Sequence, residues 1–303
     1  MLNKDQNVQL DHNSQIRLLS PRDLAEAIGV SESSVKRWAD DKRIRATRTA
    51  GGHRRISVTE AIRFVRESRT SLVKPGILGL PAAPSPASLA DTSDTTEQLY
   101  DYLADGASSQ ARGLVVSLYL GGASVAEIID GPITGAMKEL GRLWRHETRG
   151  IFVEHRATDL CVQALNQLRL MIAVDETAPI AVGGAPAGDP YTIPSLCAAL
   201  VLMAEGYQAV NLGADTPFAT LENAADELAP RIVWLSLSSG SNNSELSASI
   251  NRLTTHLHRR GTTLVVGGRV RGTLALESSP NLLVGGSMAE LAAFARGLLL
   301  AGH

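Results

Sequence analysis

Three side chains near the middle of the 303-residue chain could act together on a ligand. They belong to Trp144, Glu154 and His155, in the stretch GRLWRHETRGIFVEH. An indole offers a broad apolar face, while a neighbouring carboxylate and imidazole can exchange protons and hydrogen bonds. A helix ending near Trp144 and another starting near Glu154 would let all three cover a bound molecule. Spacing alone favours a purely structural role for these residues over a role in ligand binding. In that case Trp144 would lie in a core, and Glu154 would interact with a helix dipole.

Other features of the chain exclude several classes of protein. The two cysteines, Cys161 and Cys197, are far apart and lack metal-ligand spacing, which favours a reducing compartment without a disulfide framework. Residues 1–15 are polar and lack the apolar core of a signal peptide, and no apolar run approaches the roughly 18 residues of a membrane span. We therefore expect a cytoplasmic protein that makes no membrane contact, with a disordered tail over residues 1–15.

The net charge of −2 conceals a strongly basic segment. Between Arg17 and Arg69 the chain has thirteen Lys or Arg residues and seven Asp or Glu residues, a net charge of +6. The remainder therefore carries −8. A basic segment on an acidic body indicates that this segment alone binds a polyanion. The length of the chain favours two or three domains.

Residues 16–70 have the pattern of a helix-turn-helix followed by a hairpin. Ser20 predicts the cap of a first helix, and Gly29 predicts the turn that ends it. Ser31 predicts the cap of a second helix over Glu32–Asp40. Helix, glycine-containing turn and helix in this order are typical of DNA-binding proteins.

The segment Ile44–Ile56 predicts a basic β-hairpin that turns at Ala50-Gly51-Gly52. Such a hairpin beside a helix-turn-helix is a wing: its cations neutralise phosphates while the second helix reads base edges in the major groove. The string SVKRWADDKRIRATRTAGGHRRI, which ends at Ile56, resembles the MerR/excisionase-type winged helix-turn-helix family. The partner is then double-stranded DNA. The residues expected to contact it are Ser33, Ser34, Lys36, Arg37, Arg48, Gly52, His53, Arg54 and Arg55.

Residues 71–95 are rich in Pro, Ser and Ala and show no helical or strand periodicity, which predicts a flexible linker. Residues 96–176 follow with apolar residues at three- and four-residue spacings, broken by glycines. This pattern predicts a four-helix bundle, whose fourth helix runs from about Val153 to Ile172 and so begins with the acid–base pair. A bundle alone implies no activity.

Residues 177–303 alternate apolar runs with helical patterns, which predicts a doubly wound parallel sheet in a Rossmann-like α/β domain. Strands are expected at Ile180–Ala185, Ala209–Gly213, Arg231–Leu237, Thr263–Gly267 and Asn281–Val284, with helices beginning near Ile193, Pro217, Asn243, Arg271 and Ser287. Ligands bind such sheets at the carboxyl ends of the strands. These ends read GGAPAGDPY, LGADTP, LSLSSGS, VGGRVRG and VGGS, where Gly and Ser permit close approach but form no GxGxxG or P-loop motif.

The expected fold class is therefore multidomain: winged helix-turn-helix, four-helix bundle and parallel α/β domain. In this order the domains resemble the CarH/LitR family of cobalamin-binding, light-responsive repressors, across nearly the whole chain. The spacing of Trp144 and Glu154-His155 matches the family's residues over the upper face of adenosylcobalamin. Its LGA-x-TP stretch is matched by Leu212–Pro217, its Ser-x-Leu/Ser loop by Ser236-Leu237-Ser238 and its Gly-Gly loop by Gly267-Gly268. The cofactor-binding residues that the resemblance implies are Trp144, Glu154, His155, Asp189, Tyr191, Ser236, Ser238, Gly267 and Gly268.

Two positions depart from that family. Its lower-face motif is Glu/Asp-x-His-x-x-Gly, with the His on cobalt, whereas this chain reads DPYTIP from Asp189 to Pro194. Tyr191 thus replaces the imidazole, and a phenol is a poorer neutral ligand for cobalt. The His that directly follows the Trp in some members is also absent, because Arg145 stands there.

Three hypotheses follow. The first is a DNA-binding repressor, acting as a homo-oligomer, that holds cobalamin with its own base or no protein group below the cobalt. The second is the same regulator with another tetrapyrrole or flat aromatic ligand, or with a body that serves oligomerisation or protein partners. The third, a cobalamin-dependent mutase or methyltransferase subunit, is disfavoured because the wing would be unexplained and a substrate barrel is missing from the sequence. We therefore expect a regulator that is not an enzyme and has no metal site of its own.

Overall fold

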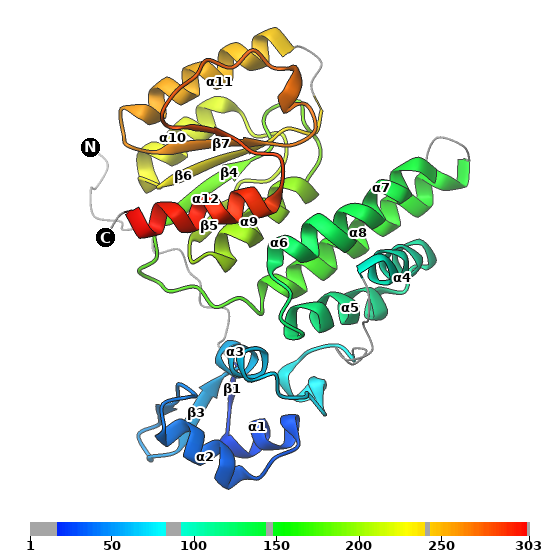
Figure 1. Ribbon diagram of the computed structural model, residues 1–303, viewed down its shortest axis with the longest axis vertical. Coiled ribbons are helices and arrows are strands. Elements are labelled where there is room, and N and C mark those ends of the chain that lie inside the picture. Colours follow the sequence, from blue (N-terminus) through cyan, green and yellow to red (C-terminus); the bar gives the residue numbers. More distant parts are fainter. Residues whose placement is uncertain (1–16, 83–91, 144–147, 240–242, 302–303) are drawn as a thin grey trace, which may run out of the picture. The chain divides into compact units, whose positions relative to one another are not determined.

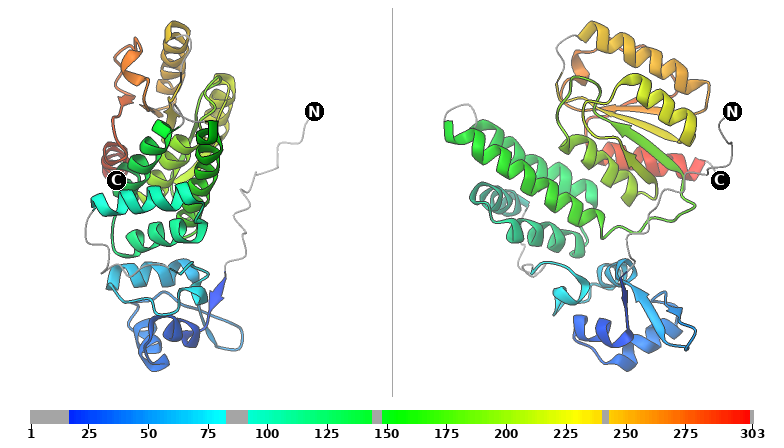
Figure 2. Two further views of the ribbon diagram at one scale, coloured as in Figure 1. Left: turned by 90° about the vertical axis from the view of Figure 1, so that its right-hand side faces the viewer. Right: turned by 180° about the vertical axis from the view of Figure 1, so that it is seen from behind.

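The computed structural model describes residues 17–82, 92–143, 148–239 and 243–301 (Figures 1 and 2). The predicted tail over residues 1–15 and the indole of Trp144 lie outside the described residues. The chain divides into two compact units, Met1–Gly79 and Leu80–His303. None of the described helices combines the length and the apolarity that crossing a membrane requires.

The first unit packs short helices against a small antiparallel sheet of strand order β1-β3-β2. Leu24, Val35 and Ile56 are fully buried in its core. The pairing of β1 with β3 was not predicted. The elements of this unit are, in chain order, β1 (Leu18–Leu19), α1 (Pro21–Ile28), α2 (Glu32–Asp40), β2 (Thr47–Arg48), β3 (Arg54–Ser57), α3 (Val58–Ser68) and the 3₁₀ helix η1 (Pro75–Leu78).

Local hydrogen bonds explain why α1 and α2 start and end where they do. The Ser20 hydroxyl accepts the N–H of Asp23 at 3.2 Å, and the Asp23 carboxylate accepts the N–H of Ser20 at 2.8 Å. Gly29 ends α1 with a φ of 71°, in the left-handed region that glycine enters at no steric cost. Ser31 then caps α2 through its hydroxyl. The predicted helix, turn and helix are therefore confirmed.

The structure differs from the predicted linker at both of its ends. After α3 the chain folds back on α1, because the N–H groups of Val73 and Lys74 donate to the Ala27 carbonyl at 2.8 and 3.0 Å. Leu78 in η1 is buried. Pro75 thus starts a helical turn and not an exposed tether. At the other end, helix α4 already begins at Thr92.

The second unit begins with a helical region. Its longest helix, α8, packs against α4, α5 and α7 and also against α9 of the following sheet. Figures 1 and 2 show α7 and α8 lying side by side. Pro132 lies within a π-helical turn, where its missing N–H cannot make an ordinary helical bond. The elements are α4 (Thr92–Asp105), α5 (Ser108–Leu120), α6 (Val125–Ile128), the π turn η3 (Ile129–Ile133), α7 (Thr134–Leu143) and α8 (Thr148–Arg169).

Helix α8 begins at Thr148, earlier than the predicted start near Val153. Its first turns expose Ile151 and Phe152, which therefore lie off the buried stripe that the sequence pattern detects. Glu154 consequently lies in the second turn of the helix and not at its N-terminus. The interaction with the helix dipole proposed as its structural role is weak there, because that effect fades beyond the first turn.

The remainder of the second unit is a parallel five-stranded sheet of order β5-β4-β6-β7-β8, which confirms the predicted α/β architecture. The predicted strands are all present, with small differences at their ends. The helix expected near Arg271 is only a short 3₁₀ turn, η4. The elements are β4 (Ile180–Gly184), α9 (Ile193–Ala204), β5 (Gln208–Asn211), α10 (Phe218–Leu228), β6 (Ile232–Ser236), α11 (Asn243–His258), β7 (Thr263–Gly267), η4 (Arg271–Thr273), β8 (Leu282–Val284) and α12 (Met288–Ala301).

Alternate residues of the strands face two separate apolar cores, as the two-residue period of a strand requires. Val233 and Leu235 of β6 face the core beneath α10 and α11. Trp234, between them, faces a larger core built by α9, α12 and the helical region. Residues 96–176 and 177–303, expected as separate domains, thus share one core within one compact unit.

Trp234 shapes the sheet just before its carboxyl edge. A Cβ at Gly183 would lie 2.2 Å from the Trp234 carbonyl oxygen and 2.4 Å from its ring, so only glycine can stand beside it. The indole N–H donates to the Ser195 hydroxyl at 3.1 Å, which donates to Asn211 Oδ1 at 2.7 Å. The same oxygen accepts the N–H of Gly213 at 3.1 Å. This series of bonds fixes the loop that follows β5.

Candidate functional site

The side chains of α2 that were predicted to contact DNA differ in their exposure and in whether they already form an ion pair within the chain. Ser33, Lys36 and Arg37 are exposed and Ser34 is half-buried. The Lys36 ammonium pairs with the Glu32 carboxylate at 2.7 Å, one helical turn away. Arg37 forms no ion pair with any described residue. It is therefore the cation of α2 that is most available to a polyanion.

The predicted hairpin is formed by β2 and β3, with Arg48 opposite Arg54. Gly52 lies in its turn with a φ of 77°, a conformation that favours glycine. Arg48 and His53 are exposed and Arg55 is half-buried. The structure thus brings the predicted cations of the hairpin together on one short ribbon.

Arg54 is placed differently from the expectation of a free phosphate contact. Its guanidinium binds the carboxylate of Asp40, the last residue of α2, and its side chain is only 22% exposed. This ion pair ties the hairpin to the end of the helix. Sequence reasoning missed it because the two partners lie in different elements, fourteen residues apart.

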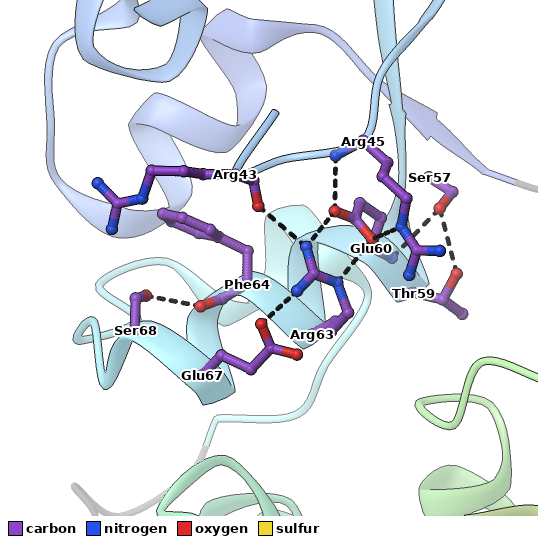
Figure 3. A network of polar contacts seen from close by, with 9 residues as sticks. All are labelled: Arg43, Arg45, Ser57, Thr59, Glu60, Arg63, Phe64, Glu67 and Ser68. Carbon is purple, nitrogen blue, oxygen red and sulfur yellow. Dashed lines mark hydrogen bonds and ion pairs between the residues drawn. The ribbon is translucent and has the colours of Figure 1, made fainter. Parts of the chain in front are cut away.

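A buried carboxylate, Glu60, organises the polar side of α3 (Figure 3). It accepts the backbone N–H and the Nε–H of Arg45 at 2.7 and 3.1 Å, and the Nε–H of Arg63 at 2.8 Å. Arg63 also donates to the Arg43 carbonyl at 3.0 Å. Burial acts to raise the pKa of Glu60, but the hydrogen bonds from Arg63 and Arg45 outweigh it and hold the pKa below its usual value. The carboxylate thus fixes the chain between α2 and the hairpin.

In the second unit, Glu154 and His155 lie side by side on α8 but differ in exposure. Their closest atoms, Oε2 and Nε2, are 3.5 Å apart, and their side chains are 27% and 75% exposed. The Thr158 hydroxyl donates to Glu154 Oε1 at 3.3 Å. Because Glu154 precedes buried Cys161 by about two helical turns, both lie on the same face of α8. Trp144 is outside the described residues, so its position beside this pair stays a prediction.

Asp189, predicted to bind the cofactor, is buried and makes several contacts within the chain. Its carboxylate accepts the N–H groups of Ser238 at 2.6 Å, Ser239 at 3.0 Å and Tyr191 at 3.1 Å. Its carbonyl accepts the N–H of Asp215 at 3.0 Å. In the structure Asp189 therefore joins the loops that follow β4, β5 and β6 and organises the carboxyl edge of the sheet.

The predicted Ser and Gly loops meet at this edge. Ser236 is buried at the end of β6, and Ser238 is half-buried two residues later. A Cβ at Gly268, whose φ is 105°, would lie 2.3 Å from the Leu237 carbonyl oxygen. At Gly267 the nearest contact of a Cβ would be an ordinary 3.9 Å. The glycine at 268 is thus required by the close approach of two loops of the chain itself.

Tyr191 and Arg269 form an exposed part of the edge. Tyr191 is 47% exposed, and the guanidinium carbon of Arg269 lies 5.9 Å from the centre of its ring. Arg269 donates from Nη2 and Nε to the Ser238 carbonyl at 2.9 and 3.3 Å. Sequence reasoning missed Arg269, although one signal was present: it directly follows the Gly-Gly pair at a strand end.

Asp130 connects the helical region to the α/β part. From η3 its carboxylate accepts the N–H groups of Met288 and Ala289, each at 2.9 Å, at the start of α12, where a negative charge is favourable. Two buried thiols occupy α8 and α9, which pack on each other. Burial raises the pKa of Cys161 to about 12 and also raises that of Cys197, so both thiols stay protonated at neutral pH.

The residues of this edge fit cobalamin only in part. The resemblance implies an imidazole at position 191 as a ligand of the cobalt, but this position holds the half-exposed phenol of Tyr191 beside the cation of Arg269. Within the described ranges, no group of three or more His, Cys, Asp or Glu side chains could hold a metal ion. The edge therefore offers hydrogen-bonding groups and a cation to a ligand, but the side chain at position 191 supplies no nitrogen that could bind a cobalt.

Comparisons with known proteins support both parts of this description. Residues 18–69 match the family described as helix-turn-helix domain, and residues 95–169 match the family described as B12 binding domain. No curated protein matches the chain. The solved monomethylamine corrinoid protein of Methanosarcina barkeri is 17% identical with a TM-score of 0.53, and the match covers 69% of this chain and 100% of that one. A novel cobalamin-binding protein from Desulfitobacterium hafniense DCB-2 is 17% identical with a TM-score of 0.35, covering 68% and 98% respectively.

At these identities the first of the two structures shows a shared fold and nothing more. Together with the family matches, it supports a helix-turn-helix unit, a helical region and a parallel α/β sheet of the Rossmann-like type found in cobalamin-binding proteins. The chain therefore contains one segment that matches a helix-turn-helix domain and another, the helical region, that matches a B12 binding domain.

Proposed function

We propose that this protein is a transcriptional regulator that binds double-stranded DNA through its first unit and a corrinoid through its second. The observation that carries the proposal is the presence of a helix-turn-helix domain and a B12 binding domain in one chain. A ligand of the second unit changes DNA binding only if it binds two states of the protein with different affinities. Regulation by the corrinoid therefore requires such a pair of states.

For the DNA contact we infer a winged helix-turn-helix of MerR type, in which α2 enters the major groove and the β2–β3 hairpin is the wing. Arg37 on α2 and Arg48 and His53 on the hairpin are exposed and form no ion pair with any described residue. These groups can therefore meet phosphates or base edges. The charge of +6 between Arg17 and Arg69 supplies the salt-dependent part of the affinity.

For the ligand we infer a cobalamin that binds between α8 and the carboxyl edge of the sheet. The resemblance to the CarH/LitR family favours adenosylcobalamin as its form. Glu154 and His155, with Trp144, would lie over its upper face. Tyr191 supplies no nitrogen to the lower face of the corrinoid, so the base of the corrinoid itself would be the ligand of the cobalt on that face. By the same resemblance we propose that the protein is a repressor, that it responds to light and that it acts as a homo-oligomer.

A regulator with a changed ligand is the second candidate, and Tyr191 is the observation that favours it. The ligand would then be another tetrapyrrole or a flat aromatic molecule, or the second unit would serve oligomerisation or a protein partner. In both candidates the protein is a regulator and not an enzyme subunit, because a purely catalytic role leaves the helix-turn-helix unit unexplained.

The ligand is tested by mixing the purified full-length protein with adenosylcobalamin in the dark, desalting, and recording the visible spectrum. We expect the corrin absorption to remain with the protein. A colourless protein would overturn the cobalamin proposal. A parallel sample with hemin addresses the second candidate, which gains support if hemin alone is retained.

The DNA contact is tested by measuring binding to the DNA upstream of the protein's own gene at several salt concentrations. Arg37→Ala is expected to weaken binding, whereas Arg252→Ala, which removes an exposed arginine of α11 in the second unit, is expected to leave it unchanged. Absence of any salt-sensitive binding by the wild type would overturn both regulator candidates.

A further inference from the structure

The carboxyl edge of the sheet holds a cation that no described acidic side chain neutralises. Arg269 follows β7, is exposed, and forms no ion pair with any described residue. The carboxylate nearest to it in the hydrogen-bond network is that of Asp189, which is buried and already accepts three backbone N–H groups. The charge of Arg269 is therefore available to a ligand at the edge where parallel sheets bind their ligands.

The loops of the edge hold the guanidinium of Arg269 in one position. The chain leaves β7 through Gly268, whose backbone lies so close to Leu237 that no side chain fits between them. Arg269 then donates from Nε and Nη2 to the carbonyl of Ser238 at 3.3 and 2.9 Å. A guanidinium carries five N–H donors, and neither of these two bonds uses Nη1. Among the described residues nothing accepts from Nη1, which is therefore positioned for an acceptor from outside the chain.

Tyr191 adds an apolar surface at the same place. Its ring is 47% exposed, and the guanidinium carbon of Arg269 lies 5.9 Å from the ring centre, within the range of a cation–π contact. Arg271 adds a second, half-buried cation, whose Nη1 donates to the Gly268 carbonyl at 2.8 Å. An arginine fork beside an aromatic ring suits an anionic group attached to a largely apolar body.

We propose that Arg269, which lies beside the ring of Tyr191, binds an anionic group of the macrocycle that the second unit takes up. This inference rests on the proposed function and names the ligand chemistry of the same site. Two sources of the anion fit: the phosphodiester of a complete corrinoid, and the carboxylates of a porphyrin. Cobinamide, a corrinoid without the nucleotide and its phosphodiester, lacks the feature that Arg269 recognises.

The experiment measures dissociation constants of the full-length protein for hydroxocobalamin, dicyanocobinamide and hemin by visible titration. Arg269→Gln is expected to weaken the binding of hydroxocobalamin about ten- to one-hundred-fold, the range of a lost hydrogen bond to a charged group, and to leave that of cobinamide unchanged. Arg269→Lys keeps the positive charge but not the paired N–H donors of the guanidinium. Its affinity for hydroxocobalamin is therefore expected to fall less than that of Arg269→Gln. Arg252→Gln, which removes another exposed arginine, in α11, is the matched control and should change none of the three constants.

Each outcome decides between the proposals. A loss confined to hemin identifies a carboxylate as the anion and supports the inference in its porphyrin form. Equal weakening of hydroxocobalamin and cobinamide, or no weakening of any ligand, overturns the role of Arg269 while corrinoid binding itself stands. A wild-type protein that binds none of the three overturns the proposed ligand and this inference with it. Matching thermal unfolding midpoints of the variants show that a loss comes from the site.

Discussion

Replacing Arg48 and Arg54 one at a time by alanine separates a DNA contact from a contact within the protein. The two residues face each other across β2 and β3, and by sequence they have the same role. Their surroundings differ. Arg48 is exposed and has no ion pair among the described residues, whereas Arg54 binds Asp40 and is 22% exposed. Only Arg48 is therefore expected to neutralise a phosphate.

The magnitudes follow from these surroundings. Each neutralised phosphate contributes about 0.9 to the slope of log K against log salt, so Arg48→Ala should reduce the slope by that amount on all DNA sequences. Arg54→Ala should leave the slope unchanged. It should lower the free energy of unfolding by less than about 1 kcal/mol, because Asp40 is 59% exposed and exposed ion pairs contribute little. Asp40→Asn, which frees Arg54, should raise the slope by up to about 0.9.

The assay is fluorescence anisotropy with an operator duplex and an unrelated duplex, from about 50 to 200 mM salt, beside urea unfolding of the same proteins. If Arg54→Ala reduces the slope as far as Arg48→Ala does, the bond from Arg54 to Asp40 opens on DNA and the argument from this structure is refuted. A large loss on the operator alone, with unchanged binding to the unrelated duplex, would show that Arg48 reads bases and not phosphates.

Three further perturbations test the ligand edge and the contacts that hold each unit together. Tyr191→His should raise the affinity for cobalamin and shift its visible spectrum by supplying an imidazole nitrogen; an unchanged affinity would mean that the lower face is closed for another reason. Glu60→Gln should lower the free energy of unfolding at neutral pH by about 2 kcal/mol, the scale of a charge-assisted hydrogen bond. Because the folded-state pKa of Glu60 is lowered, its stabilisation is present above the unfolded value near 4.5 and is lost as the pH falls. In urea unfolding at several pH values, the wild type should therefore lose more stability than the variant as the pH falls, and parallel pH profiles would contradict this. Asp130→Ala removes the acceptor of the first two N–H groups of α12 and should cost about 1 kcal/mol while speeding the reaction of Cys161 and Cys197 with a thiol reagent; an unchanged reaction rate would mean that Asp130 does not hold the two parts together.

The sheet could be predicted because its central strands are buried on both faces. Such strands are continuous apolar runs in the sequence, and β6 and β7 follow this rule. The two-residue strand Leu18–Leu19 has no periodicity and exists only through its pairing with β3. The start of α8 was misplaced because Ile151 and Phe152 are exposed and so do not continue the buried stripe of the helix.

The location of the ligand edge could be predicted, but the contacts within it could not. The rule for parallel sheets places Asp189, Ser238 and Gly268 near one another because all three follow strand ends. The bond from the Ser238 N–H to the Asp189 carboxylate spans 49 residues, and no local pattern specifies it. The direction of Arg269 likewise depends on how closely Gly268 approaches Leu237. Such pairings follow from loops that meet only in the folded chain.

The core that the sheet shares with the helical region bears on how the protein can be dissected. Leu160 of α8, Leu200 of α9 and Trp234 of β6 belong to one buried cluster. Cutting the chain near residue 177 would expose this apolar surface on both fragments and promote aggregation. The two parts should instead melt together in a single calorimetric transition. A ligand held by either part would then raise the melting temperature of both.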